Sequence, residues 1–178
     1  MIRIFIVGYM GAGKTTVGKS LALRLNLNYI DTDHFIENRY RKKIGEIFAA
    51  EGEERFREIE HRALLEVSAF EDIVISTGGG LPCFNDNMTI MNNTGITIYL
   101  EVPEEELAKR LEMSKNVRPV LKKRTGSELI AFIKENLTVR KPFYEQAKIR
   151  FQSGVNYTKK DIETLAKKVE TLLSPTYI

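Results

Sequence analysis

Short apolar runs alternate along the chain with longer segments of helical composition. The apolar runs predict strands at residues 2–7, 28–31, 73–75 and 96–100, with a weaker fifth at 149–151. Helical composition predicts helices over 14–25 and 53–68, and a further helix after Pro103, where three consecutive glutamates suit the positive end of a helix dipole. Thr125 and Glu128 have the spacing of a capping box, and Thr158 and Asp161 form a weaker cap before a last helix.

Strands separated by helices favour a parallel sheet with helices on both faces. We therefore predict an α/β three-layer sandwich with a central five-stranded parallel sheet flanked by helices. The chain has 178 residues and contains no internal repeat, low-complexity tract or linker, so we expect one domain spanning residues 1–178.

Composition narrows the possible partners. Apolar residues make up 43% of the chain and charged residues 29%, as in an ordinary globular protein, and a net charge of +3 gives no reason to expect a nucleic-acid partner. No run approaches the ~18 apolar residues of a membrane span, and the chain begins directly with a strand, so we expect no membrane partner and a cytoplasmic protein. The single cysteine, Cys83, is interpreted as packing material.

The first predicted strand leads directly into "GYMGAGKTT", a full match to the phosphate-binding loop. Glycines let backbone N–H groups point at phosphate oxygens, a lysine adds charge near the β- and γ-phosphates, and a threonine hydroxyl can bind Mg²⁺. The following helix presents its N-terminus to the same anion. The expected ATP-binding residues of this loop are Gly11, Ala12, Gly13, Lys14, Thr15 and Thr16.

Two further groups follow the second and third predicted strands, at the sheet edge where ligands gather. Asp31 and Asp33 stand just beyond the second strand; one carboxylate could face Mg²⁺ and the other an acceptor hydroxyl, although an aspartate capping a helix is a common alternative. The triplet 78–80 consists of three glycines, which permit close backbone approach and positive φ.

Arginines and one irregular segment complete the set of candidates. Arg57, Arg118 and Arg140 could grip a carboxylate or a phosphate in a bidentate manner. The segment 113–124, "MSKNVRPVLKKR", interrupts the alternation of strands and helices, and a long loop in a compact domain is often a lid.

Taken together, these motifs resemble those of the shikimate kinase family. The matching pieces are "GYMGAGKTTVGKSLA", "IDTDHFIE", "IGEIFAAEGEERFREIE", "ISTGGGLP", "RPVL" and "VRKPFYEQA", which run from residue 8 to about 147 in the family's order. The resemblance implies P-loop kinase architecture with a mobile lid, and ATP-dependent phosphorylation of the 3-hydroxyl of shikimate in aromatic amino-acid biosynthesis. It also implies Mg²⁺ as cofactor, and we expect a monomer.

The resemblance assigns roles to individual positions. It implies that Lys14, Asp33 and Arg118 are catalytic, that Asp33 contacts the acceptor hydroxyls, and that Thr15 and Asp31 serve the metal. Arg110 and Arg118 would join the ATP-binding residues. The implied acceptor-binding residues lie largely within a region of about 33–61 and in two later motifs: Asp33, Arg57, Gly78, Gly79, Gly80 and Arg140, with Phe48 and Phe56 as apolar walls and Glu60 orienting its polar neighbours.

Two features depart from the family's pattern. The stretch after the fifth strand, "FQSGVNYTKKD", lacks the proline often found in the family's adenine loop, so we assign no adenine contacts to it. The third strand ends in Ser76 and Thr77 instead of the aspartate of a standard Walker B motif, which removes one usual metal ligand.

Two other functions remain possible at this point. A gluconate-type kinase would share the phosphate loop and the lid but would need a different acceptor pocket. A nucleotide-regulated binding module would need no acceptor site, and Lys14, Thr15, Asp33 and the lid arginine argue against it.

Overall fold

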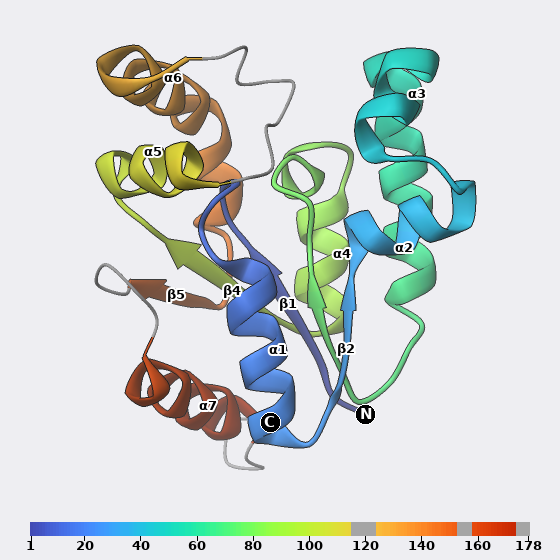
Figure 1. The fold of residues 1–178 in the computed structure, drawn as a ribbon. Coiled ribbons are helices and arrows are strands. Elements are labelled where there is room, and N and C mark those ends of the chain that lie inside the picture. The colour runs from blue at the N-terminus through green and yellow to red at the C-terminus, as the bar shows by residue number, and fades with distance from the viewer. Residues whose placement is uncertain (115–123, 153–157, 174–178) are drawn as a thin grey trace.

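A computed structural model describes residues 1–114, 124–152 and 158–173. Its centre is one parallel sheet with the strand order β2-β3-β1-β4-β5, in which β1 lies in the middle (Figure 1). All five predicted strands are confirmed, with ends that differ by at most one residue: β1 Arg3–Val7, β2 Asn28–Asp31, β3 Ile73–Ser76, β4 Ile96–Glu101 and β5 Ile149–Gln152.

Helices flank this sheet, with α1 in front of it and α4 behind it in the view of Figure 1. The predicted helix 14–25 and the helix after Pro103 are confirmed, whereas α4 and the short η1 were not predicted. The helices are α1 Lys14–Leu25, α2 Thr32–Tyr40, α3 Ile44–Val67, η1 Leu81–Cys83, α4 Asn87–Thr94, α5 Glu104–Met113, α6 Gly126–Tyr144 and α7 Lys159–Leu173.

The helix predicted at 53–68 forms the second part of α3. Gly52 has a non-helical backbone (φ 77°, ψ 174°), so α3 consists of two helical pieces that meet at this glycine. A left-handed φ of this size strains any other residue, which explains why the break falls on a glycine. The helical composition after Gly52 was recognised, but the piece before it was missed.

The two predicted helix caps have different outcomes. Thr158 and Asp161 form a reciprocal pair: the Thr158 N–H donates to Asp161 Oδ2 at 2.7 Å, and the Asp161 N–H donates to Thr158 Oγ1 at 3.2 Å. Thr125 does occupy the N-cap of α6, but its side chain makes no capping bond. The Gly126 N–H is instead bound by Glu112 Oε1 at 2.6 Å, so a tertiary contact replaces the predicted local one.

The core is divided into two parts. The main cluster is built around β1, whose Ile4, Phe5, Ile6 and Val7 are fully buried. A smaller cluster joins α2 to α3 and contains Ile36, Ile47, Phe56, Ile59 and Ala63. Among the described residues, no helix combines the length and apolar character needed to cross a membrane.

Gly18, on the buried side of α1, is fitted tightly against the sheet. A Cβ at this position would lie 2.6 Å from both Ser76 Oγ and Tyr29 Cε2. Gly18→Ala is therefore expected to lower the free energy of unfolding by about 1–3 kcal/mol, although alanine is the better helix former. Urea unfolding would measure the change, with Ser20→Ala on the same helix as control; equal stability of Gly18→Ala and wild type would contradict the prediction.

Candidate functional site

The phosphate-binding loop connects β1 to α1 at the carboxyl edge of the sheet. Three of its glycines have positive φ: 142° at Gly8, 81° at Gly11 and 91° at Gly13. A Cβ atom at Gly8 would also lie only 2.8 Å from the Leu100 carbonyl oxygen. The loop therefore needs glycine both for its backbone angles and for its close contact with β4.

Lys14 and Thr15 begin α1 and point into this loop region. Lys14 Nζ donates to the carbonyl oxygens of Gly8 and Tyr9, at 2.8 and 2.9 Å, so its charge lies within the loop. Ser76 Oγ donates to the Lys14 carbonyl oxygen at 2.9 Å, which fixes the start of α1 to the end of β3. The helix N-terminus, the open backbone and the ammonium group together form an anion-binding site.

Asp31 combines both interpretations that the sequence allowed. Its Oδ1 caps α2 by accepting the N–H groups of Asp33 at 3.0 Å and His34 at 3.4 Å. Its Oδ2 accepts the Thr15 hydroxyl at 3.0 Å. The carboxylate is thus a helix cap that also lies beside the expected metal-binding hydroxyl, and Asp33 lies in the first turn of a helix rather than on extended chain.

The glycine triplet lies against charged side chains. A Cβ at Gly78 would be 2.6 Å from Asp33 Oδ1, and one at Gly80 would be 2.7 Å from Arg57 Nη1. None of the three glycines has positive φ, so that expectation is wrong. The groups that approach them closely are side chains of the protein, and close approach to a ligand stays a prediction. Glycine is required here because Asp33 and Arg57 occupy the space that a side chain would fill.

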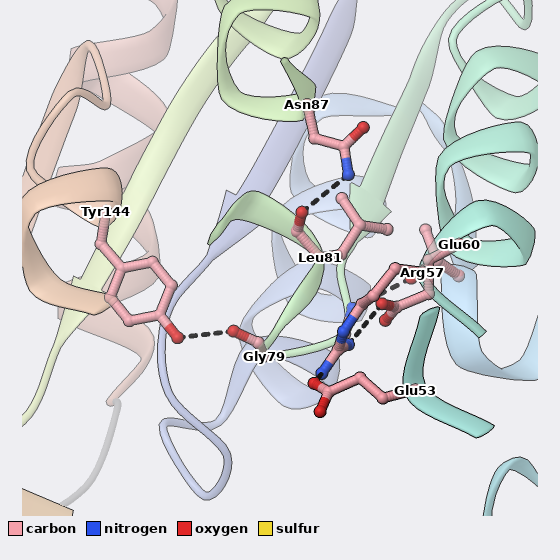
Figure 2. Close-up of polar contacts among 9 residues, drawn as sticks. Glu53, Arg57, Glu60, Gly79, Leu81, Asn87 and Tyr144 are labelled. Atoms are coloured by element: carbon pink, nitrogen blue, oxygen red, sulfur yellow. Dashed lines mark hydrogen bonds and ion pairs between the residues drawn. The ribbon is translucent and has the colours of Figure 1, made fainter. Parts of the chain in front are cut away.

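Arg57, on the second part of α3, is held from three sides, and Figure 2 shows two of these contacts, the bonds to Glu60 and Glu53. Nη1 donates to Glu60 Oε2 at 2.5 Å and Nη2 donates to Glu53 Oε1 at 3.0 Å, while the Phe84 ring centroid lies 4.1 Å from Cζ. Arg57 Nε is buried without a hydrogen-bond partner among the described residues. This donor is therefore buried at a cost that no described hydrogen bond offsets.

Glu60 is only 3% exposed, and burial raises the pKa of its carboxyl group from 4.5 to about 7. The positive charge of Arg57 lowers this pKa most strongly, and that of Arg140 lowers it as well, whereas the negative charge of Asp33 raises it. Because these three groups all act on Glu60, the structure brings the predicted acceptor-binding residues of α2, α3 and α6 into one electrostatic cluster.

The raised pKa of Glu60 predicts a pH-dependent difference in stability. The neutral carboxyl group is the form that burial favours, so its contribution is complete below about pH 4.5 and is lost as pH rises through about 7. One pKa unit corresponds to about 1.4 kcal/mol. Between pH 5 and pH 8, the free energy of unfolding of the wild type should therefore fall by about 1–3 kcal/mol more than that of Glu60→Gln. Urea unfolding at several pH values tests this, with the exposed Glu58→Gln as control. A constant difference would contradict it.

A cavity of about 270 Å³ runs along the carboxyl edge of the sheet. The phosphate loop, the two aspartates and Gly79 of the glycine triplet all contribute to its walls. Its lining includes eight predicted site residues: Gly11, Gly13, Lys14, Thr15, Asp31, Asp33, Gly79 and Arg110. Thr77, which stands where a Walker B aspartate is usual, lines it as well.

Arg110 reaches this cavity from α5. Its Nε donates to Glu106 Oε1 at 2.8 Å, and its Nη1 lies 3.4 Å from the Ala12 carbonyl oxygen. The guanidinium is therefore held beside the phosphate loop, and its binding to ATP stays a prediction. Ala12 is buried beneath the loop, and Thr16 is exposed on α1; neither lines the cavity.

The remaining candidates lie around the acceptor side or outside the described residues. Arg140 lies over the Tyr9 ring, with Cζ 5.6 Å from the ring centroid. Phe48 and Phe56 pack edge to face, with ring centroids 5.4 Å apart. Arg118 and most of the expected lid at 113–124 fall in residues 115–123, outside the described residues.

Sequence reasoning missed three residues of this site: Glu53, Phe84 and Tyr144. Glu53 and Phe84 contact Arg57. Tyr144 donates its hydroxyl to the Gly79 carbonyl oxygen at 2.5 Å. Tyr144 and Glu53 lie inside motifs that carried the resemblance, but no spacing rule connects them to their partners.

Known proteins match this chain along nearly its whole length. A family model described as shikimate kinase matches residues 10–171. The chain belongs to the shikimate kinase family. A curated shikimate kinase of Parabacteroides distasonis is 56% identical over 97% of this chain and 100% of its own length.

Solved shikimate kinases have the same fold as this family member. A structure from Bacteroides thetaiotaomicron has a TM-score of 0.88 and 47% identity, covering 97% of this chain and 98% of its own. A structure from Acinetobacter baumannii in complex with shikimate has a TM-score of 0.81 and 34% identity, covering 97% and 93%. A gluconokinase from Sinorhizobium meliloti, at 17% identity and a TM-score of 0.61, shares the fold alone.

Proposed function

We propose that this protein transfers the γ-phosphoryl group of ATP to the 3-hydroxyl of shikimate, giving shikimate 3-phosphate and ADP. The observation that carries this proposal is the shared cavity, in which Lys14 and Thr15 of the phosphate loop face the same space as Asp33 and Gly79. A phosphate donor and a hydroxyl acceptor can meet there. Phosphoryl transfer depends on this kind of positioning and on charge stabilisation.

On the donor side, the loop residues 11–16 bind the ATP phosphates, and Arg110 binds near the nucleotide. Lys14 is the catalytic cation, because its ammonium group can stabilise charge on the transferring phosphoryl group. Asp33 is the catalytic carboxylate, which orients the acceptor hydroxyl and accepts its proton. Its contact with the glycine triplet supports this assignment, because Gly78 leaves the carboxylate room at the acceptor side.

On the acceptor side, Arg57 and Arg140 bind the shikimate carboxylate. The unpartnered Arg57 Nε supports this role, because a buried donor without a partner is costly until a ligand oxygen binds it. Gly78, Gly79 and Gly80 approach the ring, and Phe48 and Phe56 provide apolar walls. Arg57 and Arg140 both act on Glu60, and two positive charges this close together would favour an acid such as shikimate over a neutral sugar.

Mg²⁺ would bind at Thr15 and Asp31, whose oxygens lie 3.0 Å apart. A hydroxyl and one carboxylate suit this ion, which usually takes few protein ligands and completes its shell with phosphate oxygens and water. When bound, it would neutralise charge on the β- and γ-phosphates.

We propose a single domain that acts as a cytoplasmic monomer, and a lid at about 113–124 that brings Arg118 to the γ-phosphate. A lid that closes only when both substrates are bound would exclude water and limit ATP hydrolysis.

A coupled assay of ADP release tests the proposed function. The purified protein should release ADP with shikimate and Mg²⁺-ATP, and much less with gluconate or with no acceptor. Mass spectrometry should identify shikimate 3-phosphate as the product. Equal turnover with gluconate, or ADP release that does not depend on shikimate, would refute the proposal.

A further inference from the structure

Tyr144 is fixed by the core and reaches the glycine triplet from there. It is the last residue of α6 and is fully buried, and its ring packs against Tyr99 of β4 with centroids 5.3 Å apart. Its hydroxyl donates to the Gly79 carbonyl oxygen at 2.5 Å (Figure 2). Burial raises the pKa of Tyr144 well above its ordinary value, so the hydroxyl keeps its proton and remains a donor.

Gly79 is held on its other side by the phosphate loop. A Cβ at Gly79 would lie 3.3 Å from the Met10 nitrogen and 3.6 Å from the Gly8 carbonyl oxygen. The Gly79 peptide therefore lies between the donor-binding loop and the Tyr144 hydroxyl. The Tyr144 hydroxyl thus contacts a peptide that itself lies against the phosphate loop.

Tyr144 also shares one helical turn with Arg140. Residues four apart lie on the same side of a helix, and the Arg140 charge acts on the Tyr144 hydroxyl by lowering its pKa against the effect of burial. Pro142 lies between them and has no N–H, so α6 lacks the bond that residue 142 would donate to the Thr138 carbonyl oxygen. With one internal bond missing, the turn depends more on its tertiary contacts, of which the bond to Gly79 is one.

We infer that Tyr144 is a positioning residue for the acceptor: its hydroxyl sets the distance between Arg140 and the glycine triplet, and fixes both relative to the phosphate loop. This inference rests on the proposed function, in which Arg140 and the glycines bind shikimate. Tyr144 itself does not touch the acceptor. Instead, Tyr144 sets the spacing between Arg140 and the glycine triplet, the two groups proposed to touch the acceptor.

Tyr144→Phe tests the inference, because it removes the hydroxyl and keeps the ring in the core. The KM for shikimate is expected to rise about five- to ten-fold, the size of one buried hydrogen bond, while the KM for ATP stays within about two-fold. The matched control is Tyr99→Phe, which removes a buried hydroxyl from the neighbouring ring but leaves the bond to Gly79. It should leave both KM values within about two-fold.

A purely structural role gives a different result. Tyr144→Phe would then lower the thermal unfolding midpoint and leave both KM values unchanged, which would overturn the inference. A double-mutant cycle with Arg140→Lys adds a second readout. If Tyr144 acts through the placement of Arg140, the double variant should lose less shikimate-binding free energy than the two single variants lose in sum. Additive losses would contradict that route.

Hydrogen exchange on the wild-type protein keeps the inference testable even if Tyr144→Phe does not fold. Shikimate should increase the protection of amides at 78–81 and at 140–144 together, because one bond joins the two segments. Protection of only one segment would overturn the inference. Wild-type turnover of shikimate is measured in parallel, so a failure of the proposed function is recognised separately from a failure of this inference.

Discussion

Lys14→Met is expected to lower kcat at least about 100-fold while the protein stays folded. In free-energy terms this is about 2.7 kcal/mol or more of lost transition-state stabilisation, the range seen when a preorganised charge or donor is removed. Methionine keeps most of the length of the side chain. It removes the ammonium group that now lies 2.8 and 2.9 Å from the carbonyl oxygens of Gly8 and Tyr9.

Steady-state kinetics and circular dichroism together test this prediction. Lys19→Met is the matched control, because Lys19 lies on the same helix but on its exposed side, away from the residues that line the cavity. The control should retain wild-type turnover. Activity of Lys14→Met within a few-fold of wild type would show that the phosphate-loop interpretation is wrong.

Arg140→Ala is expected to weaken shikimate binding about 10- to 100-fold and to leave ATP binding nearly unchanged. The loss corresponds to one charge-assisted hydrogen bond, or a bidentate pair, of about 1.5–3 kcal/mol. Arg140 packs over the Tyr9 ring, and none of the ion pairs recorded among the described residues involves it. Its removal also takes away a charge that opposes the raised pKa of Glu60, so urea unfolding of the variant accompanies the binding measurement.

Arg57→Ala should also weaken shikimate binding, but it has a second effect. It leaves the buried Glu60 without the guanidinium that partners it at 2.5 Å, so the variant should lose stability as well. The double variant Arg57→Ala, Glu60→Gln separates the two effects: stability should return in part, but shikimate affinity should not. Titration of each ligand by calorimetry provides the measurement, with Arg55→Ala on the same helix as control. Equal losses for both ligands would refute the acceptor assignment.

The sequence by itself determined the local elements of this protein. Strand and helix positions follow from apolar periodicity, which acts over a few neighbouring residues, and all five strands were predicted with ends within one residue. The phosphate loop was equally predictable, because its glycines, Lys14 and Thr15 lie within eight positions and its geometry is local. Thr158 and Asp161 cap α7 for the same reason, since their contact is local.

Helix ends were less predictable where a distant group competed with a local one. Thr125 has the residue type and spacing of a cap. The Gly126 N–H, however, donates to Glu112, which lies 14 positions before Gly126 in the sequence. The left-handed break at Gly52 was missed because a glycine within a helical pattern has no spacing signal of its own. Local propensity is a weak preference that tertiary contacts often override.

Only the tertiary structure decided how the candidate residues meet. The strand order β2-β3-β1-β4-β5 brings the ends of β1, β2 and β3 to one edge, and this order is not encoded in any single segment. Asp33 then meets Gly78, and the Tyr144 hydroxyl meets Gly79 across 65 positions of sequence. Such contacts depend on burial and packing between segments, since a hydrogen bond of this kind is favourable only where the core holds both partners in place.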